Sequence, residues 1–265
     1  FFRFVNGAAE TVAYAPGERF FYNNAAWRLL GAVVQARSGR PFHEFVTREV
    51  IRPLGMARTT FDVAAMMADP DHITPYRHRD GTPEATGFPY PNPADNPDFS
   101  FLAAAGGITS SVNEMTRYVR ALLADGAHPG GRLLPAELAR AMRTPHVPRP
   151  DGDHGTQGYG FGLTIESDFL GRTLVRHGGS ISVSTAHLAL LREQGLGVVT
   201  MANSGRMDHG TVAEAVLALL LGEDPETAVP RLAVRKRMEA FEGPYAIHRG
   251  LHAVEVRARD GLLYL

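Results

Sequence analysis

Two short segments of the sequence carry side chains that could assist the transfer of an acyl group. The first is Pro16–Asn24, where the phenol of Tyr22 and the amide of Asn24 lie two positions apart, directly before a helical pattern. A phenol can relay a proton, and an amide can orient a substrate carbonyl. A structural interpretation also fits, in which Asn24 caps the helix and Tyr22 packs its ring in the core. Taken alone, the pair favours the structural interpretation.

The second segment is His177–Ser180, which reads His-Gly-Gly-Ser in a predicted strand. Two adjacent glycines on an edge strand let the backbone of a substrate approach closely. The imidazole of His177 can steer a carboxylate or polarise a leaving group. The structural alternative is a histidine at a strand start, held by its own hydrogen bonds, with the glycines forming a bulge. Beside Tyr22 and Asn24, we favour the functional interpretation.

The composition excludes several classes of function. With a formal net charge of −1, the chain lacks the excess of positive charge that is typical of proteins that bind nucleic acid. The longest apolar run, Ala215–Leu221, is too short to span a bilayer. The absence of cysteine excludes disulfides, thiolate metal sites and cysteine nucleophiles. Lys236 is the only lysine among the 27 basic residues, so any lysine-dependent mechanism can be checked by inspection.

Helices are expected to position the two segments. Trp27, Leu30 and Val34 share a helical face after the first segment, and Gly39 is a suitable left-handed stop. Between the helices, Asp69–Phe99 is rich in Pro, Asp and Gly but also in aromatic residues, which predicts an ordered loop or small strands. The expected helices cover Asn24–Ser38, Phe42–Ile51, the residues after the capping box Ser111–Glu114, and Leu134–Met142.

The pattern of the sequence changes after Gly158, where short alternating or apolar runs are separated by turns that contain glycine. A helix over Val212–Leu221 then closes this part of the chain. Helices followed by a run of adjacent strands indicate an α+β domain in which helices flank an antiparallel sheet. The predicted strands are Tyr159–Ile165, Thr173–Arg176, Val183–Leu191 and Leu196–Ala202.

The tail has a different character. Glu223–Arg237 is linker-like, and Ala253–Arg259 with Leu262–Leu265 predicts a β-hairpin with a primed turn at Asp260–Gly261. A lone two-stranded hairpin is marginal in water. We therefore expect truncation at this end, where a second, β-rich domain begins.

An ordered set of motifs resembles the class C β-lactamase and penicillin-binding-protein family of serine hydrolases. A single Tyr-x-Asn is a weak signal, but here it is followed by further motifs in family-like order and spacing from Ala15 to Leu221. The set comprises Pro16–Asn24, Leu29–Gly31, Ser38–Gly39, Pro53–Met56 with Thr59 or Thr60, Ala105–Gly107, Ser110–Ser111 with Met115, Tyr159–Gly162, His177–Gly179 and Ala202–Ser204.

The resemblance implies roles for these residues. His177–Gly179 stands where penicillin-binding proteins carry Lys-Thr-Gly, in the His-x-Gly variant of esterases and D-amino-acid peptidases. The backbone amide of Ser180 is then a candidate oxyanion-hole donor. The catalytic candidates are Tyr22 and His177, and the substrate-binding candidates are Asn24, Gly178, Gly179 and Ser180.

One departure from the family is large. Its nucleophile lies in a Ser-x-x-Lys motif, where the lysine activates the serine hydroxyl. Here the residue three positions before Lys236 is Ala233, so the motif is absent, and Tyr22 is almost at the start of the chain. We expect that an amino-terminal segment is missing. The expected organisation is a partial β-lactamase-like domain over residues 1–222, a linker over 223–240 and the start of a β-rich, lipocalin-like domain over 241–265.

The resemblance implies a serine hydrolase or acyltransferase that acts through an acyl-enzyme on a peptide, amide, ester or thioester substrate. The candidate activities are those of a D-aminopeptidase, a carboxypeptidase, an esterase or a penicillin-binding-protein-type thioesterase. The branch of the family with a carboxy-terminal β-barrel includes D-amino-acid peptidases, esterases and such thioesterases. The alternative is a non-catalytic module that binds a peptide or the cell wall and retains the cleft. No cofactor or metal is implied, and His72, His78, His128, His146 and His154 lie among turn residues and are expected to be solvated.

Overall fold

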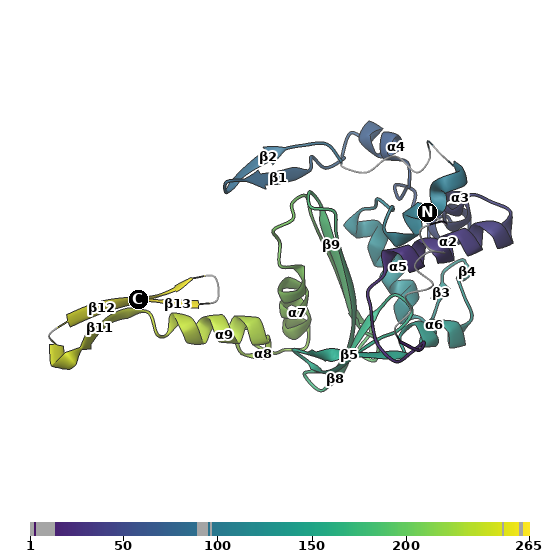
Figure 1. Ribbon diagram of the computed structural model, residues 1–265. Helices are drawn as coiled ribbons and strands as arrows, with labels where there is room; N and C mark the ends of the chain where they lie inside the picture. The colour runs from purple at the N-terminus through teal and green to yellow at the C-terminus, as the bar shows by residue number, and fades with distance from the viewer. Residues whose placement is uncertain (1–2, 4–13, 89–94, 96, 251, 260–261) are drawn as a thin grey trace. The chain divides into compact units, whose positions relative to one another are not determined.

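The computed structural model describes residues 3, 14–88, 95, 97–250, 252–259 and 262–265 (Figure 1). The chain divides into two compact units, residues 1–207 and 208–265, which are described separately below. Among the described residues, no helix combines the length and the apolarity needed to cross a bilayer.

The first unit is built on an antiparallel sheet in which each strand pairs with its neighbour in sequence, in the order β10-β9-β8-β7-β6-β5. The predicted antiparallel arrangement is confirmed. One predicted strand, Tyr159–Ile165, is wrong, because it spans the end of β6, a turn and the start of β7. The strands are β5 Val147–Gly152, β6 Gly155–Tyr159, β7 Thr164–Phe169, β8 Arg172–Ser180, β9 Thr185–Leu191 and β10 Leu196–Ala202.

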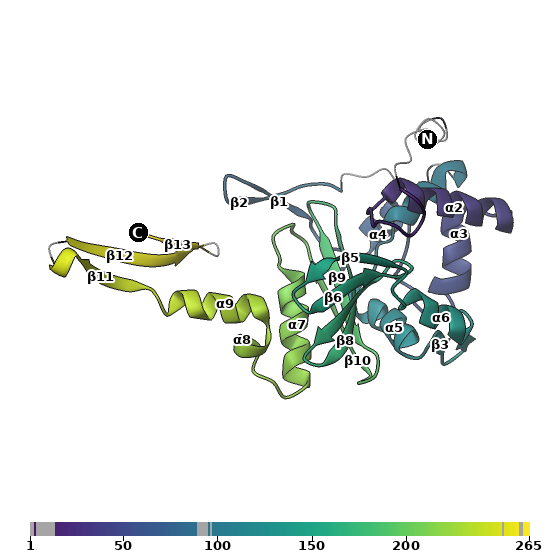
Figure 2. The same cartoon turned by 60° about the horizontal axis from the view of Figure 1, so that its bottom comes forward.

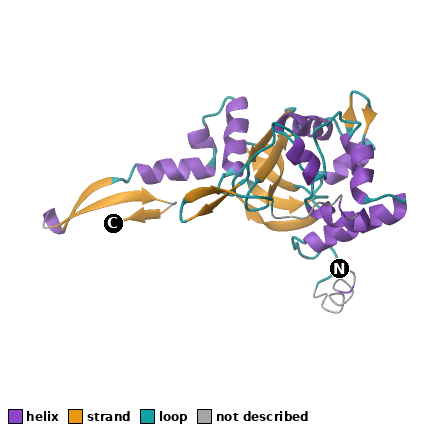
Figure 3. Ribbon diagram, turned by 90° about the horizontal axis from the view of Figure 1, so that it is seen from above, coloured by secondary structure: helices purple, strands orange, loops and turns teal. Residues whose placement is uncertain are grey.

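Helices of the first unit lie beside the sheet, which is orange in Figure 3. The helix α2 covers Asn24–Ser38 as predicted, and Gly39 ends it with a φ of 65°. The predicted helix Phe42–Ile51 is also present, although its second half is a π-helical turn. Further helices in the described part of the first unit are α4 Val63–Ala68, α5 Val112–Leu123, α6 Ala136–Met142 and the 3-10 helix η4 Pro97–Ala105.

The helix α5 lies against the sheet and joins two parts of the core (Figure 2). On the sheet side, Leu122 belongs to a buried cluster with Leu163, Ile165, Val175 and Leu190. On the other side, Ala121 belongs to a cluster with Ile51, Leu54, Met56, Phe61 and Ala103. Its close approach to β10 requires a glycine at position 197, because a Cβ there would lie 2.5 Å from Val119 Cγ1.

The start of α5 departs from the predicted capping box. Ser111 Oγ does accept from the backbone N–H of Glu114, at 3.4 Å. The carboxylate of Glu114, however, accepts from the backbone N–H of Arg58 and from the hydroxyl of Thr59, at 2.6 Å for the latter. The carboxylate of Glu114 therefore bonds to Arg58 and Thr59 rather than to the backbone at the start of its own helix. These bonds link the loop after residue 56 to α5.

A small residue fixes where α2 lies. Gly31 is buried, and a Cβ there would lie 2.6 Å from Ala104 Cβ and 2.7 Å from the carbonyl oxygen of Phe101. The backbone of α2 therefore approaches η4 more closely than any larger residue would allow. This contact sets the position of the Tyr22 segment, which leads directly into α2.

The segment Asp69–Phe99, for which an ordered loop or small strands were predicted, contains a hairpin of β1 Tyr76–Arg79 and β2 Thr82–Ala85. Residues 89–94 and 96 of this segment lie outside the described residues. The hairpin is tied to the sheet because Asn203 Nδ2 donates to the carbonyl oxygen of Thr74. A second short hairpin pairs β3 Ala127–His128 with β4 Gly131–Arg132. The expectation that His154 is solvated was wrong, since it is 5% exposed beside Phe169.

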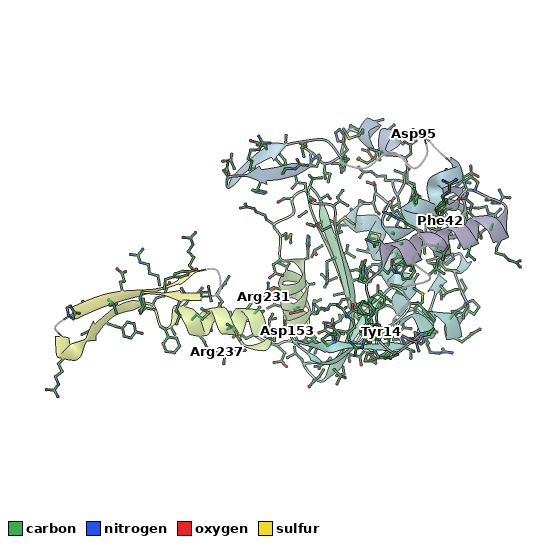
Figure 4. All side chains as sticks on the ribbon, in the orientation of Figure 1. Tyr14, Phe42, Asp95, Asp153, Arg231 and Arg237 are labelled. Atoms are coloured by element: carbon green, nitrogen blue, oxygen red, sulfur yellow. The ribbon has the colours of Figure 1, made fainter. Side chains whose placement is uncertain are left out.

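The second unit contains helices where a linker was expected. After α7 His209–Leu220, close to the predicted helix, come α8 Pro225–Ala228 and α9 Pro230–Glu239. Two ion pairs within the unit support them, Lys236 with Glu226 and Arg231 with Asp208; Arg231 is labelled in Figure 4. The division into a linker over residues 223–240 and a second domain over 241–265 remains a prediction.

The carboxy-terminal hairpin is part of a larger sheet. The strands β12 His252–Arg259 and β13 Leu262–Tyr264 pair antiparallel, as predicted, and their turn at residues 260–261 lies outside the described residues. A third strand, β11 Gly243–Ile247, pairs with β12. The third strand makes the sheet more stable than the lone hairpin that the sequence predicted.

Asp125 links the helical part of the first unit to the sheet. It lies at a φ of 52° after α5, and its carboxylate pairs with Arg143 after α6 and with Arg192 after β9, at 2.7 Å for the latter. The hydrogen bond from Arg192, together with the charges of both guanidinium groups, lowers the pKa of Asp125 against the opposing effect of burial. A folded-state pKa below the unfolded value stabilises the fold above the unfolded pKa, and this stabilisation is lost as the pH falls through the folded pKa.

We expect Asp125→Asn to lower the free energy of unfolding at pH 7 by on the order of 1–3 kcal/mol, because two guanidinium groups lose their carboxylate. The difference from the wild-type chain should shrink below about pH 4, where the unfolded-state carboxyl takes up its proton. Urea unfolding at a series of pH values measures both effects. Asp71→Asn is the control, since Asp71 also pairs with an arginine but its side chain is 87% exposed. Equal effects of the two substitutions would contradict the role of Asp125.

Candidate active site

The end of β8 has an open edge. The strand β8 is internal to the sheet, but its last pair with β7 is Arg176 with Thr164, whereas its pairing with β9 continues to Ser180. Residues 177–180 therefore have a ladder partner on one side only among the residues that the structure describes. The predicted edge position of His177–Ser180 is thus present locally, although the strand as a whole lies inside the sheet.

The two glycines of this segment differ in their surroundings. A Cβ at Gly179 would meet no heavy atom within 4 Å, so the backbone there faces open space. A Cβ at Gly178 would lie 3.0 Å from Nδ1 of His187, the residue opposite it on β9. Ser180 is exposed at the strand end, and its hydroxyl accepts from the backbone N–H of Ser182 at 3.3 Å.

Tyr22 and His177, remote in sequence, lie together in space. Their ring centroids are 6.2 Å apart. The structural interpretation of Tyr22 is wrong, because its side chain is 56% exposed rather than packed in the core. An exposed phenol next to an open strand edge is accessible to a substrate.

The structural interpretation of Asn24 is wrong as well. The cap of α2 is Asn23, whose side chain accepts from the backbone N–H of Ala26 at 3.1 Å. Asn24 is the first residue of the helix and is exposed. Because Asn23 does the capping, the amide of Asn24 is left for another role.

Sequence reasoning did not single out Tyr159 as a site residue. Its hydroxyl lies 3.4 Å from Nε2 of His177, and its ring is edge-on to Tyr22 at 6.5 Å between centroids. Tyr159 is 8% exposed, so its ring forms the inner wall beside the two predicted residues. The signal in the sequence was its place at the head of Tyr159–Gly162, a segment that was interpreted as part of a strand and as one of the family-like motifs, without a role for the tyrosine.

A guanidinium group completes this wall. Arg149 of β5 lies over the ring of Phe20 at 4.7 Å and over that of Tyr159 at 5.9 Å. One of its terminal nitrogens donates to the hydroxyl of Thr164 at 2.7 Å. A separate aromatic pair lies in the same segment of the chain, where Tyr14, labelled in Figure 4, stacks on Phe21 at 5.6 Å between ring centroids.

The surroundings favour neutral forms of both His177 and Tyr159. Burial lowers the pKa of the His177 imidazole, and the nearby charge of Arg149 lowers it further, against a hydrogen bond to the backbone of Gly178 that raises it. Burial also raises the pKa of the Tyr159 phenol, and Tyr22 adds to this effect while Arg149 opposes it. At neutral pH the site therefore holds an uncharged imidazole and an uncharged phenol.

The position of Tyr159 depends on glycines that surround it. A Cβ at Gly158 would lie 2.6 Å from Pro145 Cβ, and one at Gly160 would lie 2.2 Å from the carbonyl oxygen of Met142. In the same turn, a Cβ at Gly162 would lie 3.3 Å from the indole of Trp27 on α2. The end of β6 is therefore packed between the chain that follows α6 and the helix α2.

A family model described as Beta-lactamase matches residues 6–222 of the sequence. The chain belongs to the beta-lactamase family. The D-aminopeptidase of Gluconobacter oxydans is 31% identical over 221 residues, which are 83% of this chain and 38% of that protein. The chain thus spans about two fifths of the length of the curated relatives it matches.

Solved structures share the fold. The octameric penicillin-binding protein homologue from Pyrococcus abyssi superimposes with a TM-score of 0.83 at 29% identity, over 98% of this chain and 58% of that chain. A D-stereospecific amidohydrolase from Streptomyces gives a TM-score of 0.60 at 24% identity, over 79% of this chain and 57% of that chain. The predicted α+β fold of the β-lactamase and penicillin-binding-protein type is confirmed.

We expect Gly160→Ala to destabilise the fold by about 2–4 kcal/mol, because the new Cβ meets a backbone oxygen that cannot move independently of the chain. Thermal and urea unfolding measure the loss. The control is Gly87→Ala, since a Cβ at Gly87 meets nothing within 4 Å. A Gly160→Ala protein as stable as the control would show that the close approach at Tyr159 is absent.

Proposed function

We propose that the protein is a serine hydrolase or acyltransferase that acts through an acyl-serine intermediate on a peptide, amide, ester or thioester. The observation that carries the proposal is the meeting of Tyr22 and His177, 6.2 Å apart between ring centroids, at the open edge of β8. Membership in the beta-lactamase family and the likeness to a D-aminopeptidase support a substrate with an amide or related acyl bond.

The proposed roles follow from exposure and geometry. The exposed phenol of Tyr22 relays a proton between the serine, the leaving group and the incoming water or acceptor. The amide of Asn24 orients the acyl side of the substrate, and the backbone amide of Ser180 stabilises the developing oxyanion. His177, Gly178 and Gly179 line the substrate along the strand edge, where the open space at Gly179 admits a backbone.

The proposal requires a Ser-x-x-Lys motif, which the 265 residues do not contain. The serine oxygen attacks the carbonyl carbon and loses its proton to the lysine, and the leaving group departs with a proton returned through Tyr22. Water or another nucleophile then releases the acyl group and regenerates the serine. The second candidate is a non-catalytic module that binds a peptide or the cell wall, and a complete reading frame without the motif would favour it.

Labelling of the nucleophile separates the two candidates. The product of the complete reading frame of the gene should be labelled covalently by a fluorophosphonate or by a penicillin, whereas the 265-residue chain should not, since no nucleophile is activated in it. Mass spectrometry locates the adduct. An unlabelled full product that still binds a peptide would establish the binding module, and stoichiometric labelling of Ser180 in the short chain would contradict the assignment of the nucleophile.

We expect Tyr22→Phe in the full product to lower kcat on the order of 10²–10⁴-fold, the range of a positioned general acid or base. The KM should change little, because the phenolic proton matters mainly in the transition state. Tyr245→Phe is the matched control, as both phenols are largely exposed, at 56% and 42%. An unchanged kcat in a folded Tyr22→Phe protein would remove Tyr22 from the mechanism.

A further inference from the structure

A second pocket of the first unit lies beside the later half of α5. It has a volume of about 540 Å³ and is formed where α5 meets the turn at residue 54 and the β3–β4 hairpin, whose first strand lies next to α5 (Figure 2). Neither Tyr22, Tyr159 nor His177 lines it, so it is not part of the candidate active site. Its volume is in the range of pockets that hold small organic molecules.

The lining of this pocket is largely apolar. Ala121 and Ala124 follow Arg117 and Arg120 by four positions each, so the four residues share one side of the helix and its end. The short side chains of the two alanines leave the space that forms the pocket. The other apolar residues of the lining are Leu54, Ala127 and Pro129.

The polar side chains of the lining offer donors. One terminal nitrogen of Arg117 donates to the carbonyl oxygen of Gly55, which holds the guanidinium at the pocket and leaves its other N–H groups available. The backbone N–H of Gly130 donates to Nδ1 of His128 at 3.2 Å, so the neutral imidazole carries its proton on Nε2. With Arg120, the pocket therefore has two cations and one further N–H donor.

The two arginines lack an acidic partner. None of the lining residues is acidic, and no carboxylate pairs with Arg117 or Arg120 among the residues that the structure describes. Asp125 lies just after α5, but its carboxylate pairs with Arg143 and Arg192. Like charges three positions apart on a helix repel each other. The pocket thus combines an apolar lining with uncompensated positive charge.

Backbone hydrogen bonds hold the walls of the pocket in place. The N–H of Gly126 donates to the carbonyl oxygen of Ala121 at 2.7 Å, and that of Ala127 to the carbonyl oxygen of Ala124 at 3.1 Å. These bonds fix the hairpin to the end of α5. On the other side, Leu54 and Ala121 belong to one buried cluster. A pocket that is already formed binds a small molecule without the cost of ordering its walls.

We propose that this pocket binds a small organic anion, in which an apolar body carries a carboxylate or a phosphate group. The apolar body lies on the alanines and Leu54, and the anionic group pairs with Arg117 and Arg120, with Nε2–H of His128 as a further donor. Charge complementarity selects this occupant over a neutral or cationic molecule, because an anion between two guanidinium groups offsets their repulsion. The inference does not depend on the proposed function.

The test is a calorimetric titration of the 265-residue chain with octanoate, octyl phosphate and octan-1-ol, which share an eight-carbon chain and differ in the head group. At least one of the anions should bind with a Kd on the order of 1 mM or below, and the alcohol at least about tenfold more weakly. The ratio of the two anion affinities identifies the preferred head group.

Two kinds of variant locate the binding. Arg117→Gln combined with Arg120→Gln should weaken anion binding by at least about tenfold. The matched control combines Arg37→Gln with Arg40→Gln, which removes the same charge from exposed positions at the end of α2 and should change the affinity by less than about twofold. Ala124→Phe should block the anions by filling the pocket without changing the charge, and Ala124 is exposed, so the fold should tolerate it. Thermal unfolding checks that each variant is folded.

Several results would overturn the proposal. Equal weakening by the two arginine pairs would show attraction to overall charge alone, with Arg117 and Arg120 serving only the helix dipole. Equal affinity for octan-1-ol would show an apolar patch, and undiminished binding to a folded Ala124→Phe chain would place the anion elsewhere. Absence of binding by both anions at millimolar concentrations would reject the site outright. Because no turnover is measured, these outcomes are separate from the success or failure of the proposed enzyme.

Discussion

The arrangement of the site depends on a close approach of backbone to backbone at the end of β6. Gly158 and Gly160 let the strand press against the chain that follows α6, where a Cβ would lie 2.2 Å from the carbonyl oxygen of Met142. This approach places Tyr159 under the imidazole of His177 and brings Gly162 against Trp27 of α2. The sheet, the helical region and the segment around Tyr22 therefore meet at one point, and a Cβ at position 158 or 160 would clash with its neighbours there.

Elements with local causes could be predicted from the sequence. The bounds of α2 agree with the prediction because an Asn cap and the left-handed Gly39 act within a few residues of the helix ends, and β10 agrees because its apolar run is bounded by turns. The start of α5 shows the limit of such reasoning. Glu114 fits a capping box, but its carboxylate bonds to Arg58 and Thr59, which are more than fifty residues away and invisible to a local pattern.

The site itself was predicted only in part, and for a similar reason. The family resemblance pointed to Tyr22, Asn24 and His177, and the fold brings Tyr22 next to His177. Tyr159 and Arg149 were missed because they reach the site through pairing between β5, β6 and β7, and no periodicity in the sequence reveals that register. Their neighbours gave a weak signal, since glycines at 160 and 162, inside the predicted strand Tyr159–Ile165, and at 158, just before it, suggest close packing more than a strand.

The position of Trp27 has a spectroscopic consequence. It is the only tryptophan of the sequence, and its indole lies against Gly162 in the turn that follows Tyr159. Indole emission is sensitive to the polarity around the ring, so excitation that selects tryptophan reports on one place in the molecule. The intrinsic fluorescence of this chain therefore reports on how α2 packs beside the site, and no attached dye is needed.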